Sequence, residues 1–275
     1  MKTSINAWSI RSDADFETAI REAKEAGFEG IEFNVDAKGA HALTLDVTDA
    51  ELARISSLSE KYDLPVVSIS TSLWGGCMGQ GTDAAFEQAG RLLGCQLRCA
   101  KLLGAGGVLT VPGGMSDTLS LRAVRQSSID TLKRLRGMIE DYRINVGVEN
   151  VWNGFFMSPY DMTSFVDELD CEYIGAYYDI GNTIAFSRTE DWIDILGGRI
   201  KNAHIKGFRR ASGLNSGVEW VDISKSNIDW KRVRAALDAV GYTGYVTAEV
   251  GKTDPDMSWS DYYRMVCGEI NDIIK

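Results

Sequence analysis

Short runs rich in apolar and β-branched residues alternate with longer amphipathic segments along the chain, and this alternation restricts the fold more than any other feature. A parallel strand needs a crossover of a dozen or more residues, usually a helix, before the next strand can pair with it. The pattern therefore predicts an α/β protein with a parallel sheet. Strands are predicted at Ser4–Ser9, Gly30–Asn34, Leu64–Ser70, Gly107–Val111, Asn145–Glu149, Tyr173–Asp179, Ile200–Lys206 and Gly244–Glu249.

The segments between these runs carry helix-boundary signals. Thr48 followed three residues later by Glu51 forms a capping box, and Ser158 followed by Pro159 marks another helix start. Gly27 stands where a left-handed residue commonly ends a helix. Helices are predicted at Ala14–Ala26, 48–62, Asp83–Leu103, Thr118–Tyr142, from Ser158 onward, Glu190–Leu196, Asp229–Val240 and Trp259–Ile274.

Eight strand–helix pairs in 275 residues fit a single (β/α)8 TIM barrel, since such barrels typically span about 250 residues. No break in composition divides the chain, and its 4 Pro form no linker, so residues 1–275 are predicted to be one domain. The competing fold is a doubly wound open sheet, but no G-x-G-x-x-G motif follows the first strand. The polar, Gly/Ser-rich stretch Gly207–Asn227 is predicted to be one long loop.

Composition disfavours several classes of protein. The chain has 29 Lys+Arg against 39 Asp+Glu, and its net charge of −10 disfavours nucleic acid as a partner, which needs a basic face. No apolar stretch approaches the ~20 residues of a membrane helix and the N-terminus does not resemble a signal peptide, so we expect no membrane partner. The 5 Cys match no disulfide framework and no C-x-x-C motif, which is typical of a reducing compartment and predicts a cytoplasmic protein.

Four residues with metal-ligating side chains stand at the ends of the last four predicted strands: Glu149, Asp179, His204 and Glu249. Their spacings of 30, 25 and 45 residues approach one βα unit, which averages 275/8, or about 34 residues. Chemistry in such barrels takes place where the carboxyl ends of the strands meet. Singly, a carboxylate could cap a helix and a histidine could be a core residue. Together, three carboxylates and one imidazole predict one shared divalent metal ion.

Several segments around these residues resemble the sugar phosphate isomerase/epimerase family, the xylose isomerase-like TIM barrels. They are VENVWNGFFMSP (148–159), YYDIGN (177–182), AHIKGF (203–208), GYVTAEV (244–250), GFEGIEF (27–33) and VLTVPGG (108–114). The resemblance includes ketose 3-epimerases and hexulose-6-phosphate isomerases. It implies one divalent metal ion, Mn²⁺ first, with Mg²⁺, Co²⁺ or Zn²⁺ as alternatives, held by the four residues named above. Relatives are often dimers or tetramers, so a homodimer or homotetramer is expected.

The resemblance also implies an activity: a divalent-metal-dependent sugar or sugar-phosphate isomerase or epimerase acting on a small carbohydrate. In such enzymes the residues matching Glu149 and Glu249 act as an acid/base pair, and proton transfer passes through an enediolate. The same ligand set also serves a lyase or dehydratase acting on a keto-polyol or oxidised sugar, as in inosose dehydratase. A non-catalytic sugar-binding barrel is the weaker alternative. Apurinic endonucleases of this fold use three zinc ions and many histidines, whereas this chain has 2 His.

Further residues near the predicted strand ends are candidate substrate contacts. Lys206 lies two positions after His204 and shares its face of the strand, where it could bind a substrate oxygen or pair with a carboxylate. Arg209 follows in the next loop, where related proteins place a substrate-contacting arginine. Glu32 could bind a sugar hydroxyl or orient Lys206. Trp8 ends the first predicted strand and could form an apolar wall beside the sugar, as could Trp74 and Trp152.

Two positions depart from the pattern of the relatives. Asn182 stands three residues after Asp179, where some ketose 3-epimerases of free sugars carry histidine. Several phosphosugar epimerases share the Gly-Asn pair, so Asn182 favours a phosphosugar or another polyol as the molecule it helps to bind. Gly207 stands where relatives often carry aspartate, which removes one carboxylate from the expected mouth.

Overall fold

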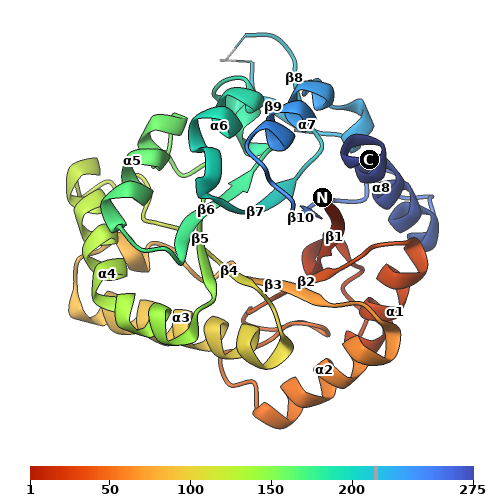
Figure 1. The fold of residues 1–275 in the computed structure, drawn as a ribbon, viewed down its shortest axis with the longest axis horizontal. Coiled ribbons are helices and arrows are strands. Elements are labelled where there is room, and N and C mark those ends of the chain that lie inside the picture. Colours follow the sequence, from red (N-terminus) through yellow and green to blue (C-terminus); the bar gives the residue numbers. More distant parts are fainter. Residues whose placement is uncertain (214–215) are drawn as a thin grey trace.

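Strand pairing closes the sheet into a ring, because β1 pairs in parallel with both β2 and β10 (Figure 1). The structure is a computed structural model that describes residues 1–213 and 216–275. The order around the ring is β1-β10-β7-β6-β5-β4-β3-β2. The bounds are β1 Lys2–Asn6, β2 Ile31–Asn34, β3 Val66–Ser70, β4 Gly107–Thr110, β5 Asn145–Glu149, β6 Ile174–Asp179, β7 Ile200–Ile205 and β10 Tyr245–Ala248. The predicted (β/α)8 barrel is confirmed.

Helices surround this ring on the outside (Figure 1). They are α1 Phe16–Ala26, α2 Asp49–Tyr62, α3 Asp83–Leu103, α4 Leu121–Tyr142, α5 Pro159–Leu169, α6 Thr189–Leu196, α7 Trp230–Ala239 and α8 Trp259–Ile274. Because the helices cover the outer face and side chains fill the interior, every residue of β2, β3, β4 and β6 is buried. No helix in the described ranges combines the length and apolar composition needed to cross a lipid bilayer.

The capping residues fix the helix ends as the sequence predicts. The Thr48 side chain accepts a hydrogen bond from the backbone N–H of Glu51, whose carboxylate returns to the backbone of Thr48. Ser158 forms the equivalent box with Asp161. Gly27 ends α1 in the left-handed conformation at φ 99°. These caps satisfy backbone groups that a helix end leaves unpaired, so the local sequence sets where α2 and α5 begin and where α1 ends.

The first predicted strand, Ser4–Ser9, is wrong at its carboxyl end. The strand stops at Asn6, and the 3-10 helix η1 covers Ala7–Ser9. The cause is local, because the Asn6 side chain accepts a hydrogen bond of 2.7 Å from the backbone N–H of Trp8 and turns the chain. Trp8 therefore lies on a turn above the barrel rather than on the strand.

The predicted loop Gly207–Asn227 is also wrong, since it contains a two-stranded antiparallel hairpin. The hairpin pairs β8 (Phe208–Arg210) with β9 (Val218–Trp220), and the 3-10 helix η5 (Ile223–Lys225) follows. At its base, the backbone N–H of Val221 donates to the carbonyl of Gly207 at 3.0 Å. A Cβ at Gly207 would lie only 2.0 Å from the Val221 carbonyl oxygen, so the returning strand requires glycine there. This contact explains the departure from the aspartate of the relatives.

Candidate metal centre and active site

Four side chains converge at the carboxyl end of the barrel. One ligand atom from each of Glu149, Asp179, His204 and Glu249 lies within 4.8 Å of the others. Glu149 and Asp179 are the last residues of β5 and β6, His204 lies in β7, and Glu249 directly follows β10. Atoms bound to one divalent ion at ~2.0–2.6 Å stand up to about 4–5 Å apart, so the cluster has the size of a metal site.

The imidazole of His204 presents Nδ1 to the three carboxylates. Nδ1 lies 3.0 Å from Glu249 Oε2, 3.4 Å from Glu149 Oε1 and 4.0 Å from Asp179 Oδ2. His204 and Asp179 are fully buried, and they are paired in register between β6 and β7. Barrel closure therefore brings together oxygens and one nitrogen from four separate strands.

Two atoms of this cluster, Nδ1 of His204 and Oε1 of Glu149, lack hydrogen-bond partners among the described residues, and Oδ2 of Asp179 is paired with the Lys206 ammonium at 2.9 Å. A buried polar atom without a partner costs about 1–3 kcal/mol, and a charged one costs more. A divalent cation placed between these two atoms and Asp179 Oδ2 would satisfy both. The oxygen-rich set with one imidazole and no thiolate fits Mn²⁺, Mg²⁺ or Co²⁺, and it also permits Zn²⁺.

Glu32 supports His204 from the opposite side of the ring. Its Oε1 lies 2.7 Å from His204 Nε2 and accepts a hydrogen bond of 2.5 Å from Asn6, while Oε2 accepts from the hydroxyls of Ser68 and Tyr177. Burial alone would raise the pKa of Glu32, but His204 and the hydroxyls of Ser68 and Tyr177 lower it below its usual value. Glu32 is fully buried. Both carboxylate oxygens of Glu32 thus have partners in this structure, and the sugar-hydroxyl contact or the orientation of Lys206 by Glu32 stays a prediction.

The ammonium group of Lys206 lies among the carboxylates of the cluster. Its Nζ lies 2.9 Å from Asp179 Oδ2 and 3.2 Å from Glu249 Oε1, and it donates to Asn182 Oδ1 at 3.5 Å. The side chain is only 9% exposed, so its charge acts in a poorly screened environment. Pairing with a carboxylate, which the sequence left as one of two roles for Lys206, is the role that the structure shows.

The pKa values of the two glutamates are shifted in opposite directions. Burial raises the pKa of Glu149 above its usual value. Burial acts the same way on Glu249, but the charges of Lys206 and His204 outweigh it and hold its pKa at about 2. Burial would lower the pKa of His204, yet the surrounding carboxylates, Glu32 foremost, raise it well above the usual range. Metal binding at this site would release the imidazole proton.

Asn150 and Asn182 hold Asp179 in place. Asn150 exchanges two hydrogen bonds of 2.8 Å with the backbone N–H and carbonyl of Asp179. The backbone N–H of Asn182 donates to Asp179 Oδ1 at 2.7 Å, and the Asn182 side chain donates to the carbonyl of Asn150. These hydrogen bonds leave Oδ2 of Asp179 facing Lys206 at 2.9 Å and His204 at 4.0 Å. The sequence prediction missed Asn150, although its place directly after Glu149 at a strand end was an available signal.

The remaining predicted contacts lie farther out. Arg209 is half-exposed on β8 and pairs with Glu219 across the hairpin at 2.7 Å, and no hydrogen bond or ion pair with a described residue joins it to the cluster. Trp74 is buried, and its indole donates to a backbone carbonyl, so it belongs to the core rather than to a sugar-facing wall. Trp152 stacks on Phe208 at 4.9 Å and is 47% exposed. Trp8 is 44% exposed and lines a pocket of its own.

Known proteins share this architecture. D-Psicose 3-epimerase from Clostridium cellulolyticum, solved with D-tagatose, superposes with a TM-score of 0.80 at 11% identity, covering 100% of both chains. The IolI protein, solved with a zinc atom, gives a TM-score of 0.79 at 15% identity, covering 100% of this chain and 98% of that one. At such identities the likeness establishes the fold.

Similarity in sequence extends over most of the chain. Among curated proteins, the uncharacterized protein MJ1311 of Methanocaldococcus jannaschii is 24% identical over 149 residues, and the match covers 52% of this chain and about half (50%) of that protein's length. Residues 20–264 match the family model described as the xylose isomerase-like TIM barrel. Since this match includes β2 to β10 and all four clustered side chains, the chain belongs to the xylose isomerase-like TIM barrel family.

Proposed function

We propose that this protein is a divalent-metal-dependent sugar or sugar-phosphate isomerase or epimerase. The observation that carries the proposal is the convergence of Glu149 and Glu249 on His204 Nδ1, at 3.4 and 3.0 Å, beside the buried Asp179. Two glutamates and one metal site in a barrel mouth are the parts that proton transfer next to a carbonyl needs. Structural neighbours named as ketose epimerases support the choice of substrate class.

The resident cofactor in this proposal is one Mn²⁺ per chain, held by Glu149, Asp179, His204 and Glu249. A bound cation of this type supplies Lewis-acid stabilisation of the negative charge that develops on a carbonyl oxygen. The zinc atom of the IolI protein supports a divalent ion in a barrel of this fold.

The chain's own residues would then move the proton. One glutamate removes a proton from the carbon beside the ketone, which leaves an enediolate, and the other glutamate returns a proton to the opposite face. Glu149 and Glu249 are the residues proposed for these two roles. Lys206 and Asn182 would bind substrate oxygens at the edge of the cluster, and Arg209 remains a predicted substrate contact on the hairpin.

Metal analysis and isotope exchange test this proposal. The purified protein should contain about one divalent ion per chain, and chelation should abolish activity that Mn²⁺ restores. A panel of ketoses, their phosphates and inososes in deuterated water should reveal at least one substrate that gains deuterium next to the carbonyl, read by NMR.

Two variants locate the proton transfer. Glu149→Gln and Glu249→Gln should each slow exchange by about 10²–10⁴-fold. The exposed Glu172→Gln serves as the matched control and should exchange at the normal rate. Full exchange in chelator-treated protein, or in either site variant, would refute the proposal.

A further inference from the structure

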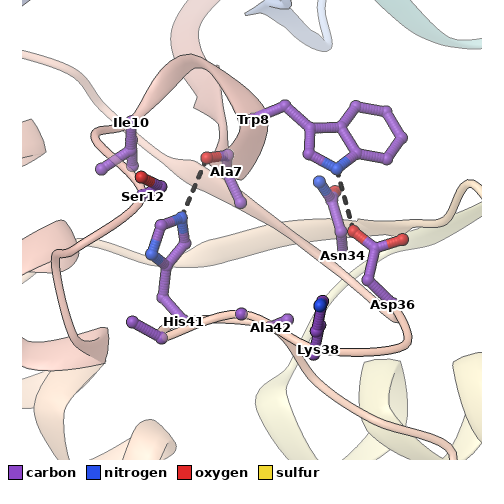
Figure 2. Close-up of a pocket in the computed structure, with 11 residues that line it drawn as sticks. Ala7, Trp8, Ile10, Ser12, Asn34, Asp36, Lys38, His41 and Ala42 are labelled. Atoms are coloured by element: carbon purple, nitrogen blue, oxygen red, sulfur yellow. Dashed lines mark hydrogen bonds between the residues drawn. The ribbon is translucent and has the colours of Figure 1, made fainter.

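A small pocket lies at the carboxyl ends of β1 and β2, the same end of the barrel as the metal centre. Its volume is about 190 Å³, and its polar and aromatic lining includes Trp8, Asn34, Asp36, Lys38 and His41 (Figure 2). Ligand pockets for a complete small molecule are usually larger, roughly 300–1,000 Å³. The volume therefore fits one ring or substituent of a ligand rather than a whole ligand.

The aromatic wall of this pocket is held in a fixed position. The indole Nε1 of Trp8 donates to Asp36 Oδ2 at 2.9 Å (Figure 2). Asp36 Oδ1 accepts from the hydroxyl of Ser72 at 2.7 Å. Trp8 is nevertheless 44% exposed. An indole anchored at its edge and open elsewhere presents a rigid apolar surface to a ligand.

The floor of the pocket is also preformed. The buried His41 ring contacts the carbonyl oxygens of Ala14 at 2.8 Å and Ala7 at 3.0 Å, which ties the loop after β2 to η1. The backbone N–H groups of Asp36 and Leu43 close this loop on itself. Little free energy would therefore be needed to order the pocket when a ligand binds.

Direct contacts connect this pocket with the metal centre. Asn34 lines the pocket and hydrogen bonds with Asn6 at 3.0 Å, Asn6 donates to Glu32 at 2.5 Å, and Glu32 contacts His204 at 2.7 Å. Asn34 lies two residues beyond Glu32 on the same strand, so it is one side-chain layer closer to the barrel mouth. Both sites lie at the carboxyl ends of the strands, and β1 is the neighbour of β10 in the ring, so a molecule reacting at the metal centre could extend along the barrel mouth to the pocket.

We propose that this pocket is a second sugar subsite, so that the natural substrate is a glycoside or disaccharide whose reacting unit is a ketose. The inference rests on the proposed function for the reacting unit. Its chemistry is that of a sugar ring: Trp8 covers an apolar C–H face, Asp36 accepts from hydroxyls, and Lys38 donates to them. Asp36 and the single ammonium of Lys38 oppose one another in charge, so the pocket does not favour a phosphate group.

Matched ketoses test the subsite. Maltulose and isomaltulose contain a fructose unit with a free 3-hydroxyl and differ from D-fructose by an added glucose ring. Deuterium exchange should show a kcat/KM about tenfold or more higher for at least one disaccharide than for fructose. Trp8→Ala should remove most of this preference, and Lys38→Met, which alters an exposed side chain, should reduce it by several-fold. A higher kcat/KM for fructose than for both disaccharides, or a preference unchanged in both variants, would overturn the subsite.

A binding measurement separates failure of the subsite from failure of the proposed function. Saturation-transfer NMR on the wild-type protein should show contact with the glucose ring of a disaccharide, and Trp8→Ala should weaken this signal even if no exchange occurs. The matched control is Leu102→Ala, which truncates a half-exposed apolar side chain at the end of α3 outside the pocket and should leave the signal intact. Absence of the glucose-ring signal in the wild-type protein would overturn the subsite, whereas its presence without exchange would count against the proposed reaction alone.

Discussion

Glu32 Oε1 lies 2.7 Å from His204 Nε2, although the two residues are 172 positions apart in the chain. The contact exists because β2 and β7 belong to one closed ring in which only β1 and β10 stand between them. It fixes the orientation of the imidazole and leaves Nδ1 as the atom that faces the three carboxylates. Glu32 is thus a positioning residue rather than a ligand.

Glu32→Gln should lower the affinity for Mn²⁺ by about 10–100-fold, since partners of a metal-bound histidine typically contribute that much. Titration calorimetry of chelator-treated protein measures the change. Glu29→Gln is the matched control, because Glu29 bonds Thr3 away from the cluster. Equal affinities in the variant and the wild type would contradict the supporting role.

Lys206→Met should destabilise the metal-free protein by about 3–5 kcal/mol, because two buried carboxylates lose their cation. The same variant should bind Mn²⁺ more tightly, since the ammonium and the metal ion neutralise the same charges. Thermal unfolding with and without Mn²⁺ checks both effects, with Lys201→Met in β7 as control. A loss of stability equal in the two conditions would be inconsistent with this account.

Asn150→Ala should lower the free energy of unfolding by about 1–3 kcal/mol, because it leaves the buried N–H and carbonyl of Asp179 without partners. Denaturant unfolding provides the measurement. Asn145→Ala, at the partly exposed start of β5, should change the stability by no more than about 0.5 kcal/mol. If both variants were equally stable, the hydrogen bonds between Asn150 and the backbone of Asp179 would contribute nothing to the free energy of unfolding.

Asp222→Asn should cost about 1 kcal/mol at pH 7, because Asp222 pairs with Lys225 at 2.6 Å and accepts from Thr253 at 2.5 Å. Burial would raise the pKa of Asp222, but these partners lower it below its unfolded value. A lowered folded pKa stabilises the protein above the unfolded pKa of about 3.9, and this contribution disappears as pH falls through the folded pKa. The free energies of unfolding of the wild type and of Asp222→Asn, measured against pH, should therefore converge in acid. The control Asp194→Asn, at an exposed position, should have the same free energy of unfolding as the wild type at every pH.

Gly207→Ala should destabilise the protein by about 1–3 kcal/mol, since the new Cβ would overlap the Val221 carbonyl oxygen and displace the hairpin. Thermal unfolding measures the loss. Gly251→Ala has open space around its Cβ position and should lie within about 0.5 kcal/mol of the wild type. A fully stable Gly207→Ala protein would show that the hairpin does not depend on this close approach.

Local signals account for the parts of the fold that could be predicted. Capping at Thr48, Ser158 and Gly27 depends on residues within one helical turn, so the sequence alone locates these helix ends. The hairpin of β8 and β9 was missed because each strand has only 3 residues, which is too short to give a recognisable alternating pattern. The early end of β1 was missed because the turn depends on the Asn6 side chain rather than on hydrophobicity.

By itself, the sequence determined the alternation of strands and helices, and hence that Glu149, Asp179, His204 and Glu249 stand at strand ends on one side of a parallel barrel. Only the tertiary structure decided what surrounds them. The support of His204 by Glu32, the placement of Lys206 among the carboxylates and the pocket at Trp8 all depend on strand register and barrel closure. These features bring together residues that are far apart in the chain, and no local sequence pattern predicts such contacts.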